Sequence, residues 1–263
     1  MDYLVVSLAS LVVAALTLFS GFGLGTLLMP VFAIFFPVDV AVAATAVVHL
    51  LNNLFKLALL GKSAAWRIVA LFGIPAALAA IPGAWLLESL SGGEPIASYE
   101  LAGRACEVTP VKLVLATLIV GFALFDLVPR FRRLAFDRRL VPVGGAISGF
   151  FGGLSGHQGA LRSAFLTKLD LSAKEFVGTS AVCAVIVDVV RLAVYGLAFA
   201  ALKSRSGTIP EIPWGVVGAG SAAALLGSVI GARLIKKVTM QTIQLIVGAL
   251  LIAVGLALGA GIV

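Results

Sequence analysis

The stretch "GGLSGHQGALRSAFL", residues 152–166, places a histidine, a glutamine and an arginine among glycines within an otherwise apolar region. Glycine weakens a helix because it has no side chain that restricts the backbone. A charged side chain inside hydrocarbon is costly unless it faces protein, a ligand or water. The stretch therefore predicts a helix that is interrupted within a membrane, with a functional site at the interruption.

The composition of the whole chain agrees with a membrane environment. The 263 residues are 61% hydrophobic and only 12% charged, and the mean hydropathy is +1.14. A soluble core cannot bury so large a share of apolar side chains. We therefore expect an all-α polytopic protein of the cytoplasmic membrane, in contact with the lipid bilayer. Its first apolar segment lacks the basic start of a secretory signal and is expected to be retained.

About eight apolar segments follow one another along the chain. The first and fifth are too long for one straight crossing, which takes about 20 residues. Both contain glycines, namely Gly21, Gly23 and Gly25 in the first and Gly152, Gly153, Gly156 and Gly159 in the fifth, so we expect a break in each. The segments are residues 3–36, 38–60, 66–88, 110–129, 140–167, 173–202, 212–236 and 240–262.

The net charge of +7 is spread over short loops, which indicates membrane orientation rather than a nucleic-acid surface. The loop with Lys62 and Arg67 is predicted to be cytoplasmic, and the acidic loop at residues 88–107 is predicted to lie outside. Cys106 falls in that outer loop and Cys183 in an apolar helix, so no disulfide is expected. No metal or cofactor site is predicted. A second basic loop, also predicted to be cytoplasmic, contains Arg130, Arg132, Arg133, Arg138 and Arg139.

An internal duplication is indicated by two pairs of similar patches. "SGFGLGTLL" at residues 20–28 resembles "SGHQGALR" at residues 155–162, and "ATAVV" at 44–48 resembles "GTSAV" at 178–182. The separation of Gly25 from Gly159 equals that of Thr45 from Thr179. We therefore expect two repeats, 1–129 and 130–263, each with a broken segment followed by three continuous helices. Parallel and inverted arrangements both remain open, and the basic cluster at residues 233–237 slightly favours inversion.

The two breaks predict an anion site. Half-helices that begin after Gly25 and Gly159 would direct free N–H groups and positive dipole ends at the breaks. Arg162 lies in the first turn after Gly159, where it can contact the same anion; alternatively, it forms a structural ion pair with Asp170 or Asp188. His157 adds a donor at the break, or else caps a helix through a free carbonyl.

A polar stripe accompanies the breaks. Thr45, His49, Asn52 and Lys56 share one face of a helix, because they are spaced by three or four residues. Such residues either contact a ligand or hold helices together, and Lys56 and Arg191 are interpreted as extending toward the interface from helix ends. His157, His49 and Asp188 are candidates for proton coupling. The candidate substrate-binding residues are Arg162, His157, Gln158, Ser163, His49, Asn52, Asn53, Thr45, Thr179, Gly25 and Gly159.

The glycine-rich segments "SGFGLGTLLMP" (20–30) and "FFGGLSGHQGALRSAFL" (150–166) resemble those of the sulfite exporter TauE/SafE family of membrane transporters. The resemblance covers nearly the whole chain. It implies a secondary carrier of sulfite or of small organosulfur or carboxylate anions. In the second segment, His157 and Gln158 stand where the family pattern is rich in glycine, and Ala164 replaces the proline found at Pro30.

The sequence thus predicts a secondary transporter of a small oxyanion with no enzymatic activity. A homo-oligomer is compatible with this prediction. Two other interpretations are kept. A proton-linked carrier of another substrate, such as a metal cation, would need Asp126, Asp170 and Asp188 to face the cavity. An intramembrane enzyme would need His157 to meet Ser155 or Ser163 and an orienting carboxylate.

Overall fold

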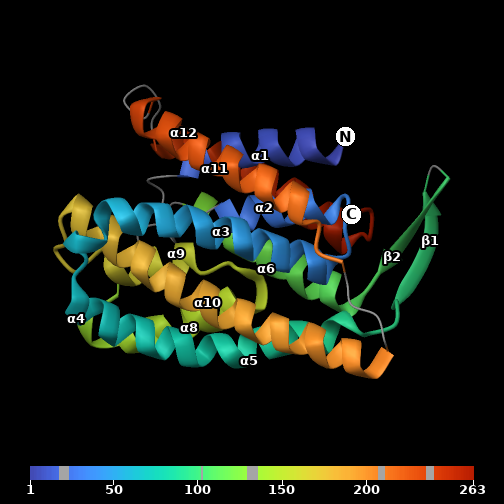
Figure 1. The fold of residues 1–263 in the computed structure, drawn as a ribbon, viewed down its shortest axis with the longest axis horizontal. Helices are drawn as coiled ribbons and strands as arrows, with labels where there is room; N and C mark the ends of the chain where they lie inside the picture. Colours follow the sequence, from blue (N-terminus) through green and yellow to red (C-terminus); the bar gives the residue numbers. More distant parts are fainter. Residues whose placement is uncertain (18–23, 102, 129–135, 207–210, 235–239) are drawn as a thin grey trace.

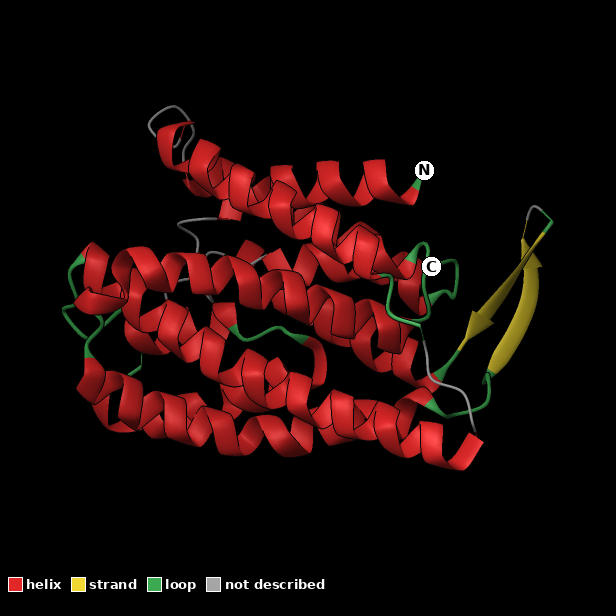
Figure 2. Cartoon of the chain, in the orientation of Figure 1, coloured by secondary structure: helices red, strands yellow, loops and turns green. Residues whose placement is uncertain are grey.

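The computed structural model describes residues 1–17, 24–101, 103–128, 136–206, 211–234 and 240–263 (Figure 1). Several residues of the sequence analysis, Gly21, Gly23, Arg130, Arg132 and Arg133, lie outside these ranges. The described part of the chain is mostly helical (Figure 2). Residues up to 129 contribute α1 (Asp2–Thr17), α2 (Leu24–Ala33), α3 (Val38–Leu60), α4 (Trp66–Ile68), α5 (Ile74–Ser91) and α6 (Pro110–Leu127), with short turns η1 (Gly61–Ser63) and η2 (Val69–Gly73). Residues from 130 contribute η3 (Arg138–Leu140), α8 (Val141–Ser155), α9 (Gly159–Leu166), α10 (Ala173–Ser206), α11 (Trp214–Leu234) and α12 (Met240–Gly259).

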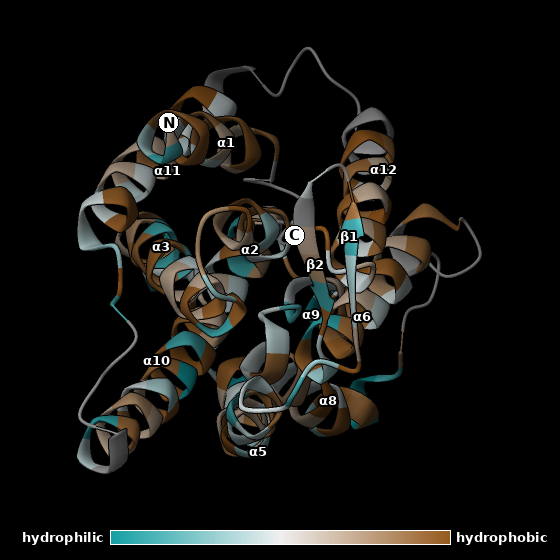
Figure 3. Ribbon diagram, turned by 90° about the vertical axis from the view of Figure 1, so that its right-hand side faces the viewer, coloured by the Kyte–Doolittle hydropathy of each residue, from teal (hydrophilic) through white to brown (hydrophobic). Residues whose placement is uncertain are grey.

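Four described helical stretches are long and apolar enough to cross a membrane, namely Val38–Ser63, Trp66–Ser91, Ala173–Ser204 and Trp214–Gly231. Shorter apolar helices cover Asp2–Leu16, Leu24–Ala33, Pro110–Leu124 and Leu245–Gly259. Apolar residues line these helices along their length (Figure 3). The fold is therefore that of a polytopic helical membrane protein.

The expectation of an all-α protein is wrong for the loop between α5 and α6. This loop forms an antiparallel hairpin of β1 (Ala97–Leu101) and β2 (Arg104–Val108), in which Tyr99 pairs with Cys106. Gly103, with φ +76°, supplies a left-handed residue at the turn. The Tyr99 hydroxyl donates to the Ala260 carbonyl just beyond α12, so the hairpin is attached to the C-terminal end of the chain.

Glycines bring two pairs of helices into backbone contact. A Cβ atom on Gly145, Gly149 or Gly153 of α8 would lie only 2.1–2.2 Å from a carbonyl oxygen of η2 or α5. Gly227 and Gly231 of α11 approach the carbonyls of Leu11 and Ala15 in α1 in the same way. Apolar area alone does not hold helices together in lipid, so such close backbone packing is a main source of association.

The order of these contacts fixes the relative direction of the helices. Gly145, Gly149 and Gly153 meet Phe72, Ala76 and Ala80 in ascending order, so α8 and α5 are parallel, and α11 and α1 are parallel for the same reason. In contrast, α3 and α10 are antiparallel, since Gly178 lies beside Leu60 whereas Asp188 meets His49. The contacts of Gly248 with Leu127 and of Gly259 with Ala116 make α12 antiparallel to α6.

The chain turns back on itself between α8 and α9. A Cβ on Gly144 would overlap the ring of Phe165, and the Ser148 hydroxyl donates to the Gln158 carbonyl, at 2.8 Å. The two helices are therefore antiparallel.

Helix α3, like α1, is parallel to α11, since Gly220 lies near Val48 and Ser228 near Asn52. Helix α2 runs opposite to α3, because its start lies near His49 and its end is joined to the start of α3 by residues 34–37 alone. It follows that α2 also runs opposite to α1.

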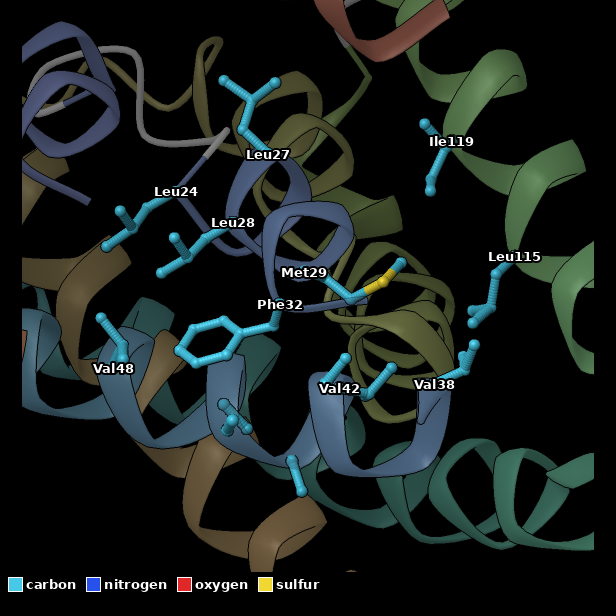
Figure 4. Close-up of a cluster of buried hydrophobic side chains, with 14 of the residues drawn as sticks. Leu24, Leu27, Leu28, Met29, Phe32, Val38, Val42, Val48, Leu115 and Ile119 are labelled. Carbon is cyan, nitrogen blue, oxygen red and sulfur yellow. The ribbon is translucent and has the colours of Figure 1, made fainter. Parts of the chain in front are cut away.

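The main hydrophobic core surrounds α2. Leu28, Met29 and Phe32 of α2 are buried and lie close to α3, which contributes Val42 and Val48, and to α6, which contributes Leu115 and Ile119 (Figure 4). This packing holds the first turn of α2 near the middle of α3, at the level of the polar residues described next.

Candidate functional site

The linker between α8 and α9 consists of residues 156–158 and is buried. Gly156 has φ +80°, and its N–H donates to the Gly152 carbonyl, which ends α8. A Cβ on Gly25, in the first turn of α2, would lie 3.7 Å from the Gly156 carbonyl oxygen and 3.5 Å from Cδ2 of His49. The start of α2 therefore lies against this linker, beside His49 of α3.

Asp188 of α10 is fully buried at this meeting point. Its Oδ2 lies 2.6 Å from Nδ1 of His49, and its Oδ1 lies 3.0 Å from Nε and 2.8 Å from Nη2 of Arg191. The Gln158 side-chain N–H donates to the same Oδ1 at 3.3 Å. A carboxylate so close to the ring of His49 requires a proton between them, which places that proton on Nδ1.

Arg162 joins this group through Gln158. Its Nη1 donates to Oε1 of Gln158 at 3.1 Å, and the Arg162 residue is 3% exposed. We call His49, Gln158, Arg162, Asp188 and Arg191 the central polar cluster. The cluster joins side chains from α3, α9, α10 and the linker before α9, and it contains two guanidinium groups and one carboxylate.

The interpretation of Arg191 as a residue that extends toward the interface is wrong. Arg191 is 1% exposed and lies in the interior of the 34-residue helix α10, one turn after Asp188. Because α10 runs from Ala173 to Ser206, Arg191 lies several turns from both ends, and the same holds for the expected segment at residues 173–202. The spacing of Asp188 and Arg191 by three residues was the available signal for an ion pair.

Two further candidates contact neighbouring elements. Oδ1 of Asn52 accepts from the Ser228 hydroxyl of α11 at 2.7 Å, and Oγ1 of Thr179 accepts from the Ala65 N–H before α4 at 2.9 Å. The contact of Asn52 holds α3 to α11, which is the alternative role foreseen for the stripe, and Thr179, expected to bind substrate, holds α10 to the segment before α4. Asn53, in contrast, donates to the His49 carbonyl at 2.8 Å and lies against the His49 ring, beside the central polar cluster.

The remaining polar candidates lie around this centre. Thr45 is 2% exposed and lies one turn before His49. Lys56 is half-buried on the last turns of α3, and Ser163 is half-buried on α9. Asp170 is exposed, beyond the end of α9.

His157 faces a different direction from Gln158. Its Nδ1 lies 3.1 Å from the Ser155 carbonyl oxygen and 2.9 Å from the Ser155 hydroxyl, and its ring stacks on Phe122 of α6 with centroids 5.5 Å apart. The contact with the carbonyl that ends α8 is the geometry of a capping histidine. The buried carboxylate of Asp188 contacts the ring of His49, whereas the ring of His157 contacts Ser155. Among the described residues, no group of three or more His, Cys, Asp or Glu side chains could hold a metal ion.

Charged residues buried inside the helices of a multi-pass membrane protein commonly mark a substrate or ion pathway. The family model of the sulfite exporter TauE/SafE family matches residues 6–258. The chain belongs to this family, and membership implies an exporter-type transporter of sulfite or another anion. Comparisons with curated proteins and with solved structures gave no match.

Proposed function

We propose that this protein is a secondary transporter that moves a small oxyanion, sulfite or an organosulfonate, across the cytoplasmic membrane. The anion binds at the central polar cluster, between the start of α2 and the linker of α8 and α9. The observation that carries this proposal is the pair of buried guanidinium groups of Arg162 and Arg191 beside the linker at residues 156–158.

The chemistry of the cluster suits an oxyanion. A guanidinium group presents several N–H donors in one plane, which match two oxygens of a sulfite or sulfonate group. The start of α9 at Gly159 adds backbone N–H groups and a positive helix end at the same linker. The side chain of Gln158 contacts both Asp188 and Arg162, so it links the two charged groups that an anion would perturb.

A cation site is less well supported. Asp188 is the carboxylate at the centre, and its oxygens contact His49, Arg191 and Gln158. Asp170 is exposed, and the side chain of Asp126 lies outside the described ones. A metal ion would therefore have to compete with a buried guanidinium for one carboxylate, which favours an anion as the substrate.

The arrangement of helices supports inverted repeats, 1–129 and 130–263. Helices α1 and α3 run opposite to their counterparts in the second half, α8 and α10. Helix α6 likewise runs antiparallel to its counterpart, α12. The contact of α1 with α11 corresponds to that of α8 with α5. A pseudo-two-fold axis in the membrane plane would relate the halves, as in carriers that alternate access around a central site.

Sulfite flux into proteoliposomes tests the proposal. Arg162→Ala should lower the flux at least about tenfold, since a charge-assisted hydrogen bond contributes about 1.5–3 kcal/mol. Arg67→Ala, which removes an exposed arginine from α4, should leave the flux unchanged. Normal flux through a well-folded Arg162→Ala protein would remove this residue from the site. Competition of the flux by methanesulfonate and acetate would then define the preferred anion.

A further inference from the structure

The buried carboxylate of Asp188 occupies the guanidinium group that an incoming anion would need. Asp188 is 0% exposed and Arg191 is 1% exposed, and Oδ1 of Asp188 lies within 3.0 Å of both Nε and Nη2 of Arg191. The same guanidinium extends to the α8–α9 linker, because a Cβ on Gly156 would lie 2.8 Å from Nη1. Arg191 thus contacts both Asp188 and the backbone at which the oxyanion is proposed to bind.

We propose that Asp188 and the transported oxyanion compete for Arg191, and that the anion displaces Asp188 as Asp188 takes up a proton. This inference rests on the proposed anion site and adds its coupling ion, the proton. Asp188 is then an internal substitute for the substrate in the empty site.

The physical reason is the repulsion of like charges in a buried place. Two anions beside one guanidinium repel each other, and the repulsion is weakly screened where water is excluded. A proton on Asp188 removes one negative charge and allows the guanidinium to turn its donors to the oxyanion. Binding of the anion and of the proton therefore reinforce each other, each raising the affinity for the other.

His49 offers the route for this proton. Its side chain is 12% exposed, whereas that of Asp188 is 0% exposed. The proton on Nδ1 moves to Oδ2 of Asp188 while Nε2 takes one proton from water. His49 remains neutral with its proton moved from Nδ1 to Nε2, and the protein gains one proton for each anion bound.

Other charged and titratable groups influence whether Asp188 is ionised or protonated. On the side of α3, Lys56 interacts electrostatically with His49, and on the side of α9, Arg162 interacts with Asp188. On α10, Tyr195 lies one turn beyond Arg191 and interacts with Asp188, and on the linker His157 interacts with Arg191. The cations keep Asp188 ionised in the empty site, and a bound oxyanion offsets them.

Two further carboxylates provide matched controls. Asp39 and Glu88 line a separate cavity of about 330 Å³ between the start of α3 and the ends of α5 and α10, together with Phe199. Asp39 lies on α3, which also carries His49, and Glu88 lies on α5, which packs against α10. Among the described residues, neither carboxylate forms a hydrogen bond with Arg191 or His49.

Isothermal titration calorimetry of sulfite binding tests the proposal with the purified full-length protein. Titrations from about pH 6 to 8.5, in buffers of different ionisation enthalpy, give the number of protons taken up per sulfite bound. The wild type should take up about one proton beyond those that sulfite itself exchanges, and its affinity should fall by up to about tenfold per pH unit. Asp188→Asn should lose this extra proton and bind sulfite more tightly than the wild type at the alkaline end. Glu88→Gln and Asp39→Asn should keep the wild-type proton count.

Infrared difference spectroscopy of the wild type keeps the test decisive even if Asp188→Asn does not fold. Added sulfite should produce the C=O stretching band of a protonated carboxylic acid, and the band should persist in Glu88→Gln. Sulfite binding without the band, or with equal proton counts in wild type and Asp188→Asn, would overturn the coupling and leave the anion site intact. A wild type that binds no sulfite at any pH would overturn both.

Discussion

Gly156 holds the linker between α8 and α9 in a conformation that other residues adopt only with strain. Its φ of +80° lies in the left-handed region, and a Cβ there would lie 2.8 Å from Nη1 of Arg191. Gly156→Ala should therefore cost about 1–2 kcal/mol of backbone strain and also displace Arg191. We expect a clear loss of sulfite flux at normal membrane insertion.

Gly103 is the matched control for that change. Its φ is +76°, but no atom of the described residues beyond its chain neighbours lies within 4 Å of a Cβ built there. Gly103→Ala carries the backbone strain alone, so it should lower the thermal unfolding midpoint without changing the flux. Equal flux in the two variants would show that the position of Arg191 does not matter for transport.

His157 has contacts that indicate a structural role. Its Nδ1 meets Ser155 at the end of α8, and its ring stacks on Phe122. His157→Gln should lower the stability by about 1 kcal/mol through the lost stacking, while the pH dependence of sulfite flux stays parallel to that of the wild type. A flattened pH curve, measured on protein of normal stability, would instead make His157 a proton carrier.

Much of the central polar cluster could be predicted from the sequence. Glycines around polar residues indicated Gln158 and Arg162, and helical spacing placed His49 on a polar face. The contact of Asp188 with His49 could not be predicted, because it depends on how α3 and α10 pack, whereas the three-residue spacing of Asp188 and Arg191 was already compatible with an ion pair. Hydropathy also gives no sign that His157 and Gln158, adjacent in sequence, face different helices.

At the scale of elements, the contact of α8 with α5 depends on the absence of side chains. A Cβ on Gly149 would lie 2.1 Å from the Ala76 carbonyl oxygen, so Gly149→Ala forces the two backbones apart. The expected cost is about 1–3 kcal/mol, with a lower thermal unfolding midpoint and less folded protein in the membrane.

Gly196→Ala separates this effect from helix propensity. Gly196 lies in α10, and in the described part of the chain no neighbouring atom lies within 4 Å of a Cβ built there, so alanine should stabilise the helix by up to about 1 kcal/mol. Unfolding of both variants in detergent, followed by circular dichroism, measures the difference. Equal midpoints would mean that α8 and α5 can separate at little cost.

Hydropathy was sufficient to predict a helical membrane protein, but it could not give the direction of the chain after each break. Glycines weaken a helix without determining whether the next one continues or returns, and the return of α9 depends on contacts such as that of Phe165 with Gly144. The hairpin of β1 and β2 was missed because its residues were read only as an acidic loop. Its attachment through Tyr99 to Ala260 is a contact between distant parts of the chain.

For the whole molecule, the proposed inverted repeats predict which ends share a side of the membrane. The end of α10 and the C-terminus should both be extracytoplasmic, and the loop after α3 should be cytoplasmic, because its Lys62 and Arg67 are basic. Single cysteines at Ser204 and Val263, in a background without Cys106 and Cys183, should react with an impermeant reagent in intact cells. A cysteine at Lys62 should react only after lysis. Labelling of Lys62→Cys alone in intact cells would refute this orientation.

Because α1 packs along α11 and α5 packs along α8, each half of the chain completes its helix contacts only with the other half. The partner of α1 is synthesised about 200 residues later, and contacts so distant in sequence form slowly. The first half must therefore wait in the bilayer with the face of α1 open to lipid or to an insertion factor. Assembly of the central polar cluster is correspondingly a late event, since Asp188 and Arg191 reach His49 only when α10 has entered the membrane.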